Sequence, residues 1–231
     1  MAPRRAIVLF ARTPEAEAAS KRLPVSRTAP LFSAVAAAWL RAAARHDATA
    51  IIACHRNDRE RLTAIAPDVE RLWLEQCGAT FGARLAGAAD DAFALGFTRV
   101  IVTGIDAPPP ADLGAAFEGL DDGKTVIAPA SDGGINLIGL TAPCALLKTI
   151  EPRQRDVAKR CEAAFERLLI LEQTTDIDTQ RDLARARHNR AWRPFVHLLM
   201  TAAWAPYQRQ TKACNGQATY IRPPPPALRP A

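Results

Sequence analysis

Hydrophobic positions along the chain gather into seven short runs, and longer segments with a different spacing separate them. Several of the runs, such as "RAIVLF" (5–10) and "TRVIVTG" (98–104), are almost wholly apolar. Continuous apolar runs of this length are typical of strands that are covered on both faces of a sheet. The pattern predicts strands at 5–10, 48–54, 69–74, 98–104, 124–130, 135–140 and 168–173.

The segments between these runs have helical spacing. In 80–97, apolar residues recur every three or four positions, beginning with Phe81 and Leu85. The Ala-rich segment 30–46 begins with a proline, which suits the first turn of a helix. The spacing predicts helices at 30–46, 80–97, 111–120 and 179–188. Strands that alternate with helices indicate an α/β fold, with a Rossmann-type, mainly parallel sheet flanked by helices.

The C-terminal part of the chain has a different character. The segment 193–204 has the spacing of one more amphipathic helix, whereas 205–231 is rich in proline and basic residues. Four consecutive prolines at 223–226 favour polyproline II over a packed element. We therefore expect a single domain over 1–192, and over 193–231 a helix followed by a disordered tail.

Composition excludes several classes of protein. The chain is 48% hydrophobic and 23% charged, as in ordinary globular proteins. No apolar run approaches the roughly 18 residues of a membrane helix, and 5–10 is too short for a signal-peptide core. The five scattered cysteines form no CxxC pair, and no HExxH motif is present. We expect a cytoplasmic protein with neither a disulfide framework nor a zinc site.

The net charge of +6 lies at the two ends of the chain. Residues 1–30 carry six basic and two acidic side chains, and residues 185–231 carry eight basic and no acidic ones. A basic tail can contact nucleic acid or anionic lipid, but a solvated extension is the simpler interpretation. We rank nucleic acid last among the partners because the tail lacks the interleaved aromatic residues of single-strand binders.

Candidate chemistry follows the predicted strands, because ligands of open α/β sheets bind at the carboxyl ends of strands. After the first strand, 11–24 is expected to be a loop that carries Arg12, Lys21 and Arg22. Cationic side chains at a strand end suit a polyphosphate. An ordinary charged loop is the alternative.

Asp106 follows the strand 98–104 directly, in the stretch "IVTGIDAPPP" (101–110). The prolines restrict the backbone behind it and would hold its carboxylate rigidly. One aspartate, with nucleotide oxygens as further ligands, is enough to hold Mg²⁺. The alternative is that Asp106 caps the helix predicted at 111–120.

The third candidate segment is "APASDGGINLIGL" (128–140), in which two glycines follow Asp132. Gly133 and Gly134 allow a positive φ and a close approach of the backbone to a ligand. Asp-Gly is also a strong signal for a hairpin turn between two strands. Both interpretations stay open at this stage.

Taken in order, these motifs resemble a bacterial family of glycosyltransferase-A-like (GT-A-like) transferases. Members of that family are often found beside radical-SAM and selenium-related domains, and are distant relatives of the molybdenum-cofactor and 2-phospholactate guanylyltransferases. The resemblance covers roughly residues 5–187. It is carried by "LFARTP" with "KRLP", "FGARL", "TGIDAP", "PASDGGINLIGL" and "DIDTQRDL".

The resemblance implies a single GT-A domain that binds a nucleotide, with Asp106 as its metal-holding and catalytic aspartate. Asp132, also expected to be catalytic, would lie with Gly133 and Gly134 in the acceptor-side loop. Asp178 would supply a second metal carboxylate, unless it or Thr179 caps the helix at 179–188. Asp176, two residues before Asp178, is a further candidate for this role and ranks below Asp178.

By the same resemblance, Arg12, Lys21 and Arg22 would stabilise the leaving group. The implied function is transfer from an NTP or a nucleotide sugar to a small-molecule acceptor, with Mg²⁺ or Mn²⁺ as cofactor. Nucleotidyl and glycosyl transfer are both compatible with these motifs, and the oligomeric state is open.

The sequence also departs from the family pattern. Glu17 stands where the family has glycine, and "EPRQRD" (151–156) replaces an expected Trp-Ser/Thr motif. Glu17 would repel a triphosphate. The alternative is therefore a non-catalytic protein that binds a nucleotide or a partner on the same scaffold.

Overall fold

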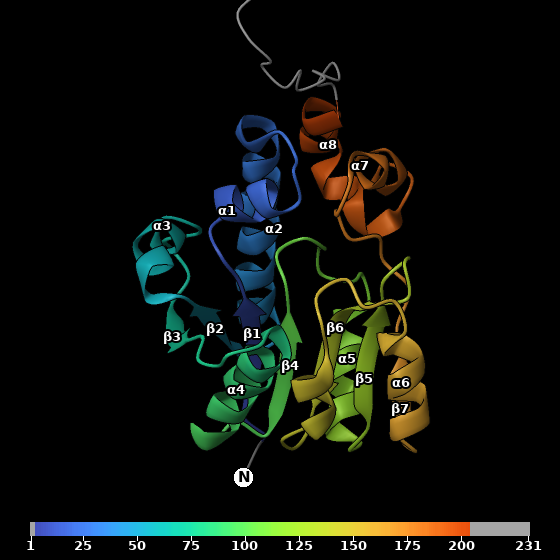
Figure 1. Cartoon of the computed structure of the whole chain (residues 1–231). Coiled ribbons are helices and arrows are strands. Elements are labelled where there is room, and N and C mark those ends of the chain that lie inside the picture. Colours follow the sequence, from blue (N-terminus) through green and yellow to red (C-terminus); the bar gives the residue numbers. More distant parts are fainter. Residues whose placement is uncertain (1–2, 204–231) are drawn as a thin grey trace, which may run out of the picture.

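The computed structural model describes residues 3–203, and these form an α/β fold around one seven-stranded sheet (Figure 1). The spatial order of the strands is β3-β2-β1-β4-β6-β5-β7. All neighbouring pairs are parallel except those of β6, which runs antiparallel to both β4 and β5. The strands are β1 (Arg5–Phe10), β2 (Ala48–Cys54), β3 (Arg71–Glu75), β4 (Arg99–Thr103), β5 (Thr125–Pro129), β6 (Ile135–Leu140) and β7 (Leu168–Ile170).

All seven predicted strands are confirmed, with boundaries shifted by at most a few residues. The almost wholly apolar runs lie in the middle of the sheet, where both faces are covered. In β1, for example, Ile7 and Leu9 belong to one core cluster, and Ala6 and Val8 to the other. This alternation follows from the two-residue period of a strand.

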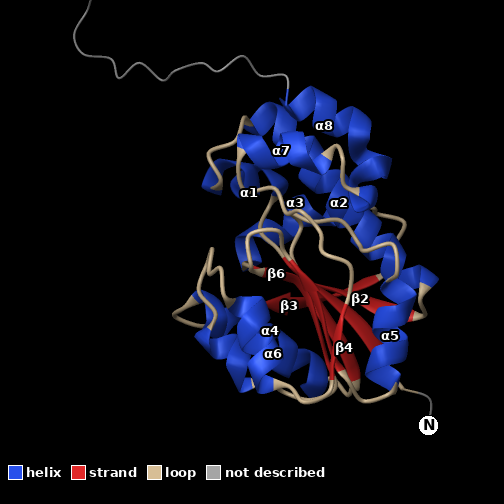
Figure 2. Cartoon of the chain, turned by 90° about the vertical axis from the view of Figure 1, so that its right-hand side faces the viewer, coloured by secondary structure: helices blue, strands red, loops and turns tan. Residues whose placement is uncertain are grey.

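Helices cover both faces of the sheet (Figure 2). One core cluster contains α2 and α5, and the other contains α4 and α6. The α-helices are α1 (Pro14–Ser20), α2 (Val25–Arg45), α3 (Arg59–Thr63), α4 (Phe81–Ala94), α5 (Leu113–Asp121), α6 (Val157–Ala164), α7 (Gln180–Ala186) and α8 (Val196–Ala203). Three short 3₁₀ helices are η1 (Arg56–Asp58), η2 (Ala145–Thr149) and η3 (Arg190–Phe195).

The expectation of a loop over 11–24 was wrong, because 14–20 forms α1. The Thr13 side chain accepts a hydrogen bond from the Ala16 N–H, and Pro14 opens the first turn. A capping threonine followed by proline is an ordinary helix start. The helix predicted at 30–46 also starts earlier, at Val25. Pro30 is exposed inside it rather than at its first turn.

The segment expected to begin a separate tail contributes apolar side chains to the core. Within it, Leu199 is fully buried and Phe195 nearly so, and both belong to the cluster around α2, as does Trp192 at the end of the expected domain. The boundary at 192/193 stays a prediction, and the tail expected over 205–231 lies outside the described residues. Within 3–203, no helix has both the length and the apolar character that membrane crossing requires.

Candidate active site

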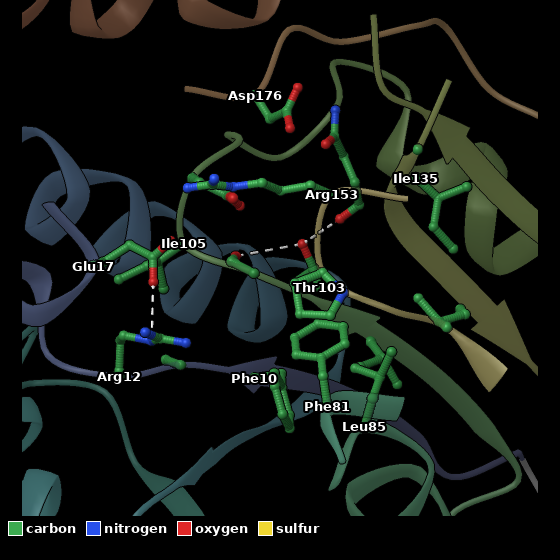
Figure 3. Close-up of a pocket in the computed structure, with 18 of the residues that line it drawn as sticks. Phe10, Arg12, Glu17, Phe81, Leu85, Thr103, Ile105, Ile135, Arg153 and Asp176 are labelled. Carbon is green, nitrogen blue, oxygen red and sulfur yellow. Dashed lines mark hydrogen bonds and ion pairs between the residues drawn. The ribbon is translucent and has the colours of Figure 1, made fainter. Parts of the chain in front are cut away.

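A cavity of about 750 Å³ opens where β1 and β4 end and β6 begins (Figure 3). Its walls come from α1, the start of α4, the β5–β6 turn and the segment 150–157. This is the edge of the sheet where ligands of open α/β folds bind. The cavity therefore lies where the sequence predicted the chemistry to be.

Three carboxylates converge in this cavity. Each contributes one carboxylate oxygen to a group whose atoms all lie within 4.8 Å of one another. The three residues are Asp106, Asp176 and Asp178. Between the latter two, Ile177 is fully buried, and its N–H donates to the Asp106 carbonyl at 3.0 Å. Because the Ile177 side chain turns into the core, both of its neighbours face the cavity together with Asp106.

Lys21, at the end of α1, lies among these carboxylates. Its Nζ is 2.6 Å from Asp106 Oδ2, 2.6 Å from Asp178 Oδ1 and 3.3 Å from Glu17 Oε1. Burial by itself would lower the pKa of Lys21, but the charges of Asp106, Glu17 and Asp178 raise it well above its usual value. The ammonium group is therefore a permanent cation that holds the carboxylates together.

Glu17 engages the cations that were expected to bind phosphate. Its carboxylate is 3.3 Å from Arg12 Nε and also contacts Lys21. Burial and the nearby charge of Asp106 raise the pKa of Glu17, while Lys21 and Arg12 oppose that shift. In the free chain, both cations thus have a carboxylate of the protein as partner.

Asp176 experiences the strongest crowding of negative charge. Burial and the charges of Asp106 and Asp178 raise its pKa to about 7, although Lys21 opposes the shift. Carboxylate oxygens are the ligands that Mg²⁺ and Mn²⁺ prefer. The donor set of Asp106, Asp176 and Asp178 therefore fits a hard divalent cation, and the Lys21 ammonium lies against the carboxylates of Asp106 and Asp178.

The structure confirms that Thr179 caps the helix, and decides against Asp178 and Asp106 as helix caps. Thr179 is the N-cap of α7, and the Asp182 carboxylate accepts from the Thr179 N–H at 2.7 Å. The Asp178 carboxylate accepts from Lys21 instead. Asp106 likewise binds Lys21, and Asp112 is the N-cap position of α5.

The Asp-Gly-Gly segment is a hairpin turn that also lines the cavity. It joins the antiparallel strands β5 and β6, and the Gly134 N–H donates to Asp132 Oδ1 at 2.9 Å. Gly133 has φ +96°, and a Cβ there would lie 2.0 Å from the Arg155 carbonyl oxygen. Only glycine fits that position. The structure is therefore compatible with both interpretations of the segment, as a hairpin turn and as a backbone that lies close to a ligand.

Most of the residues predicted for the site line the cavity, and two do not. Gly133 packs behind its wall, and Arg22 is exposed, with φ 56°, without lining it. The predicted residues that line it are Arg12, Lys21, Asp106, Asp132, Gly134 and Asp178.

Arg153 was missed from the sequence, and Asp176 was named only below Asp178 as a candidate metal ligand. The Asp-x-Asp spacing of 176–178 was the signal for Asp176, because alternate residues of an extended segment share a face. Arg153 has φ 63° and reaches across the cavity, where its Nη2 lies 3.5 Å from the Ser20 carbonyl (Figure 3). It forms no ion pair within residues 3–203. No local signal identifies Arg153, since its place depends on how 150–157 packs.

A sequence model of a bacterial family, described as "Uncharacterized protein conserved in bacteria (DUF2064)", matches residues 37–154. The chain belongs to this family. The match spans the end of α2, the strands β2 to β6 and the start of the cavity-lining segment 150–157. No curated protein matches the chain.

Solved structures share the fold. A protein assigned as a nucleotide-diphospho-sugar transferase, from Desulfovibrio desulfuricans G20, is 24% identical with a TM-score of 0.68, over 86% of this chain and 95% of that one. The 4-diphosphocytidyl-2C-methyl-D-erythritol synthase of Anaerococcus prevotii DSM 20548 is 11% identical with a TM-score of 0.51, over 80% and 95%. At these identities the likeness shows the GT-A-like fold alone. The link to radical-SAM domains and to the two guanylyltransferases stays a prediction.

Proposed function

We propose that this protein is a metal-dependent transferase that uses an NTP or a nucleotide sugar as donor and a small molecule as acceptor. The observation that carries the proposal is the carboxylate triad of Asp106, Asp176 and Asp178, with Lys21 among them. The triad lies at the ligand-binding edge of a scaffold that nucleotide transferases share. Charge and position together favour a metal-bound polyphosphate.

Each charged residue has a part in this proposal. Asp106, Asp176 and Asp178 would hold Mg²⁺ or Mn²⁺, which when bound neutralises phosphate charge. Arg153 and Arg12 both line the cavity and would hold phosphate oxygens by charge-assisted hydrogen bonds. Lys21 would exchange a carboxylate partner for a phosphate oxygen once the triad binds a metal.

Asp132 lies at the acceptor side, on the β5–β6 turn. In nucleotidyl transfer, an acceptor oxygen forms a bond to the α-phosphorus, and pyrophosphate leaves with the electron pair of the broken bond. In glycosyl transfer, the acceptor bonds to the sugar carbon and a nucleoside diphosphate leaves. In either case Asp132 is placed to accept the acceptor's proton, because its carboxylate is held by the Gly134 N–H.

The ion pairs of Glu17 favour a second candidate, a non-catalytic nucleotide- or partner-binding protein. Glu17 takes up Arg12 and Lys21 in the free chain, and its charge opposes a bound triphosphate. A protein of this kind would bind a nucleotide without turning it over, and its function would not depend on Asp106.

Product analysis separates these candidates. The protein is incubated with Mn²⁺, a panel of NTPs and nucleotide sugars, and a small-molecule extract of bacterial cells as a source of acceptor. Release of pyrophosphate indicates nucleotidyl transfer, and release of a nucleoside diphosphate indicates glycosyl transfer. We expect Asp106→Asn and Asp178→Asn to abolish release, and the exposed-surface variant Asp68→Asn to keep it. Nucleotide binding without any release would support the non-catalytic candidate.

A further inference from the structure

One wall of the cavity is mainly apolar, with Arg84 as its charged residue. It is formed by Phe10 at the end of β1, Phe81 and Leu85 in the first turns of α4, and Ile135 at the start of β6. All four line the cavity, and none is fully buried. They continue the core cluster between the sheet and α4 out to the cavity surface. Figure 3 shows Phe81 and Leu85 at the opposite end of the site from Asp176.

This apolar wall is built before any ligand arrives. The Phe10 and Phe81 rings pack edge to face, with centroids 5.6 Å apart. Next to Phe81, Gly82 lies so close to the η2 segment that a Cβ would be 2.6–2.7 Å from the carbonyl oxygens of Leu147, Lys148 and Ile150. Such packing fixes the start of α4 against the segment that leads into 150–157. A preformed apolar surface binds an apolar group without the cost of ordering it.

Three polar side chains beside the apolar wall already have protein partners, whereas the buried Arg84 Nε has none within residues 3–203. The Thr103 hydroxyl donates to the Asn136 carbonyl, and the Asn136 amide donates to the Thr174 carbonyl. The Gln76 amide donates to the carbonyls of Ala11 and Ala53. A sugar or another polyol on this wall would lose water from its hydroxyl groups and gain few donors in return, which is unfavourable.

We propose that the apolar wall is the acceptor subsite, and that the acceptor carries an apolar ring or hydrocarbon body next to the oxygen that is modified. This inference rests on the proposed function. The body packs against Phe10, Phe81, Leu85 and Ile135, and the polar head points back towards Asp132 and the carboxylate triad. The wall and the triad thus give the acceptor one orientation in the cavity.

The proposal is tested with two phosphate esters of similar charge, one of which carries an apolar ring and the other a polar glycerol group. Binding of phenyl phosphate and of glycerol 3-phosphate to the full-length protein is measured by calorimetry in the presence of Mg²⁺. We expect phenyl phosphate to bind about tenfold more tightly, as the burial of a ring's apolar surface implies. Leu85→Gln on α4 and Ile135→Thr on β6 remove that preference and leave glycerol 3-phosphate binding unchanged. The control is Leu95→Gln, since Leu95 is 46% exposed at the far end of α4 and outside the cavity.

The stabilisation of each variant by nucleotide and Mg²⁺ is measured in parallel, as a shift of the unfolding midpoint. A nucleotide shift that survives in Leu85→Gln, together with a lost preference for phenyl phosphate, supports the inference. Equal binding of the two phosphates, no binding of either, or a preference that survives both substitutions overturns it. If nucleotide no longer raises the unfolding midpoint of either variant, the wall holds the donor's base. That result would also overturn the inference. A wild-type protein that no nucleotide stabilises overturns the proposed function itself, and the inference with it.

Discussion

One buried lysine contacts three of the carboxylates in the cavity. The Lys21 side chain is only 6% exposed and contacts Glu17, Asp106 and Asp178. A buried ion cluster adds little to the free energy of unfolding, but removing one partner lowers that free energy strongly. The reason is that the remaining charges stay buried and unpaired. This asymmetry makes Lys21 a sensitive probe of whether a metal shares its site.

We predict that Lys21→Met destabilises the metal-free protein by about 3–5 kcal/mol. A divalent cation that binds the same carboxylates should restore part of this loss, since it replaces the missing positive charge. Thermal unfolding of wild type and variant in EDTA and in Mg²⁺ measures the effect. An equal loss under both conditions would show that the metal and Lys21 do not share these carboxylates.

The raised pKa of Asp176 gives a second prediction, for stability against pH. Its carboxyl titrates near 3.8 when unfolded and at about 7 when folded, so the folded state holds the proton more tightly. The stability from this group is complete below about pH 4 and is lost as the pH rises through 7. In metal-free protein at pH 8, Asp176→Asn should raise the free energy of unfolding by about 2–4 kcal/mol.

At pH 4 the same substitution should change the unfolding free energy little. The control is Asp68→Asn, whose side chain is 64% exposed in an ion pair with Arg41. It should stay within about 1 kcal/mol of wild type at both pH values. Chemical denaturation at pH 4 and pH 8 makes the comparison. An Asp176→Asn variant as stable as wild type at pH 8 would contradict the crowding of the triad.

At the scale of the elements, Gly82 allows helix α4 to pack closely against the η2 segment. Gly82→Ala would place a Cβ against three backbone carbonyls of the η2 segment, and we expect a loss of about 1–3 kcal/mol from overpacking. Gly87 is the matched control on the same helix, because a Cβ there meets a single atom, at 3.5 Å. Gly87→Ala should be neutral or stabilise by about 0.5–1 kcal/mol. Urea denaturation measures both, and equal effects would refute the close packing of α4 on η2.

Elements with a continuous apolar pattern were predictable from the sequence, and elements defined by tertiary packing were not. The central strands, such as β1 and β4, were found because their buried positions are contiguous in sequence. Helix α1 was missed because the acidic and basic residues of 11–24 obscured the Thr13-Pro14 start. The short α3 and α6 have too few apolar positions to show a period.

The same distinction holds for the site. Asp106 and Asp178 were found through family motifs, and the hairpin at Asp132 through its turn signal. Arg153 depends on the packing of 150–157 between α4 and the β5–β6 turn, and the sequence carries no sign of that contact. Arg22 was chosen for its charge, but the backbone turn after α1 leaves it exposed, outside the cavity lining.

At the scale of the whole molecule, the last described helix is joined to the core. Leu199 of α8 is fully buried in the cluster around α2, whereas Met200 is 42% exposed. We predict that Leu199→Ala lowers the free energy of unfolding by about 2–5 kcal/mol, in a single cooperative transition. Met200→Ala should cost less than about 1 kcal/mol. A separate early transition in Leu199→Ala, monitored by circular dichroism, would instead support a boundary near residue 192.

We propose that the carboxylate triad holds a divalent metal that binds a nucleotide. The most direct test is a thermal-shift screen of NTPs and nucleotide sugars, with and without Mg²⁺ or Mn²⁺, on wild type and on Asp106→Ala. A ligand that binds only the folded state raises the unfolding midpoint. We predict a metal-dependent increase with at least one nucleotide in the wild type and none in Asp106→Ala. No increase with any nucleotide, or an equal increase in the variant, would contradict the claim.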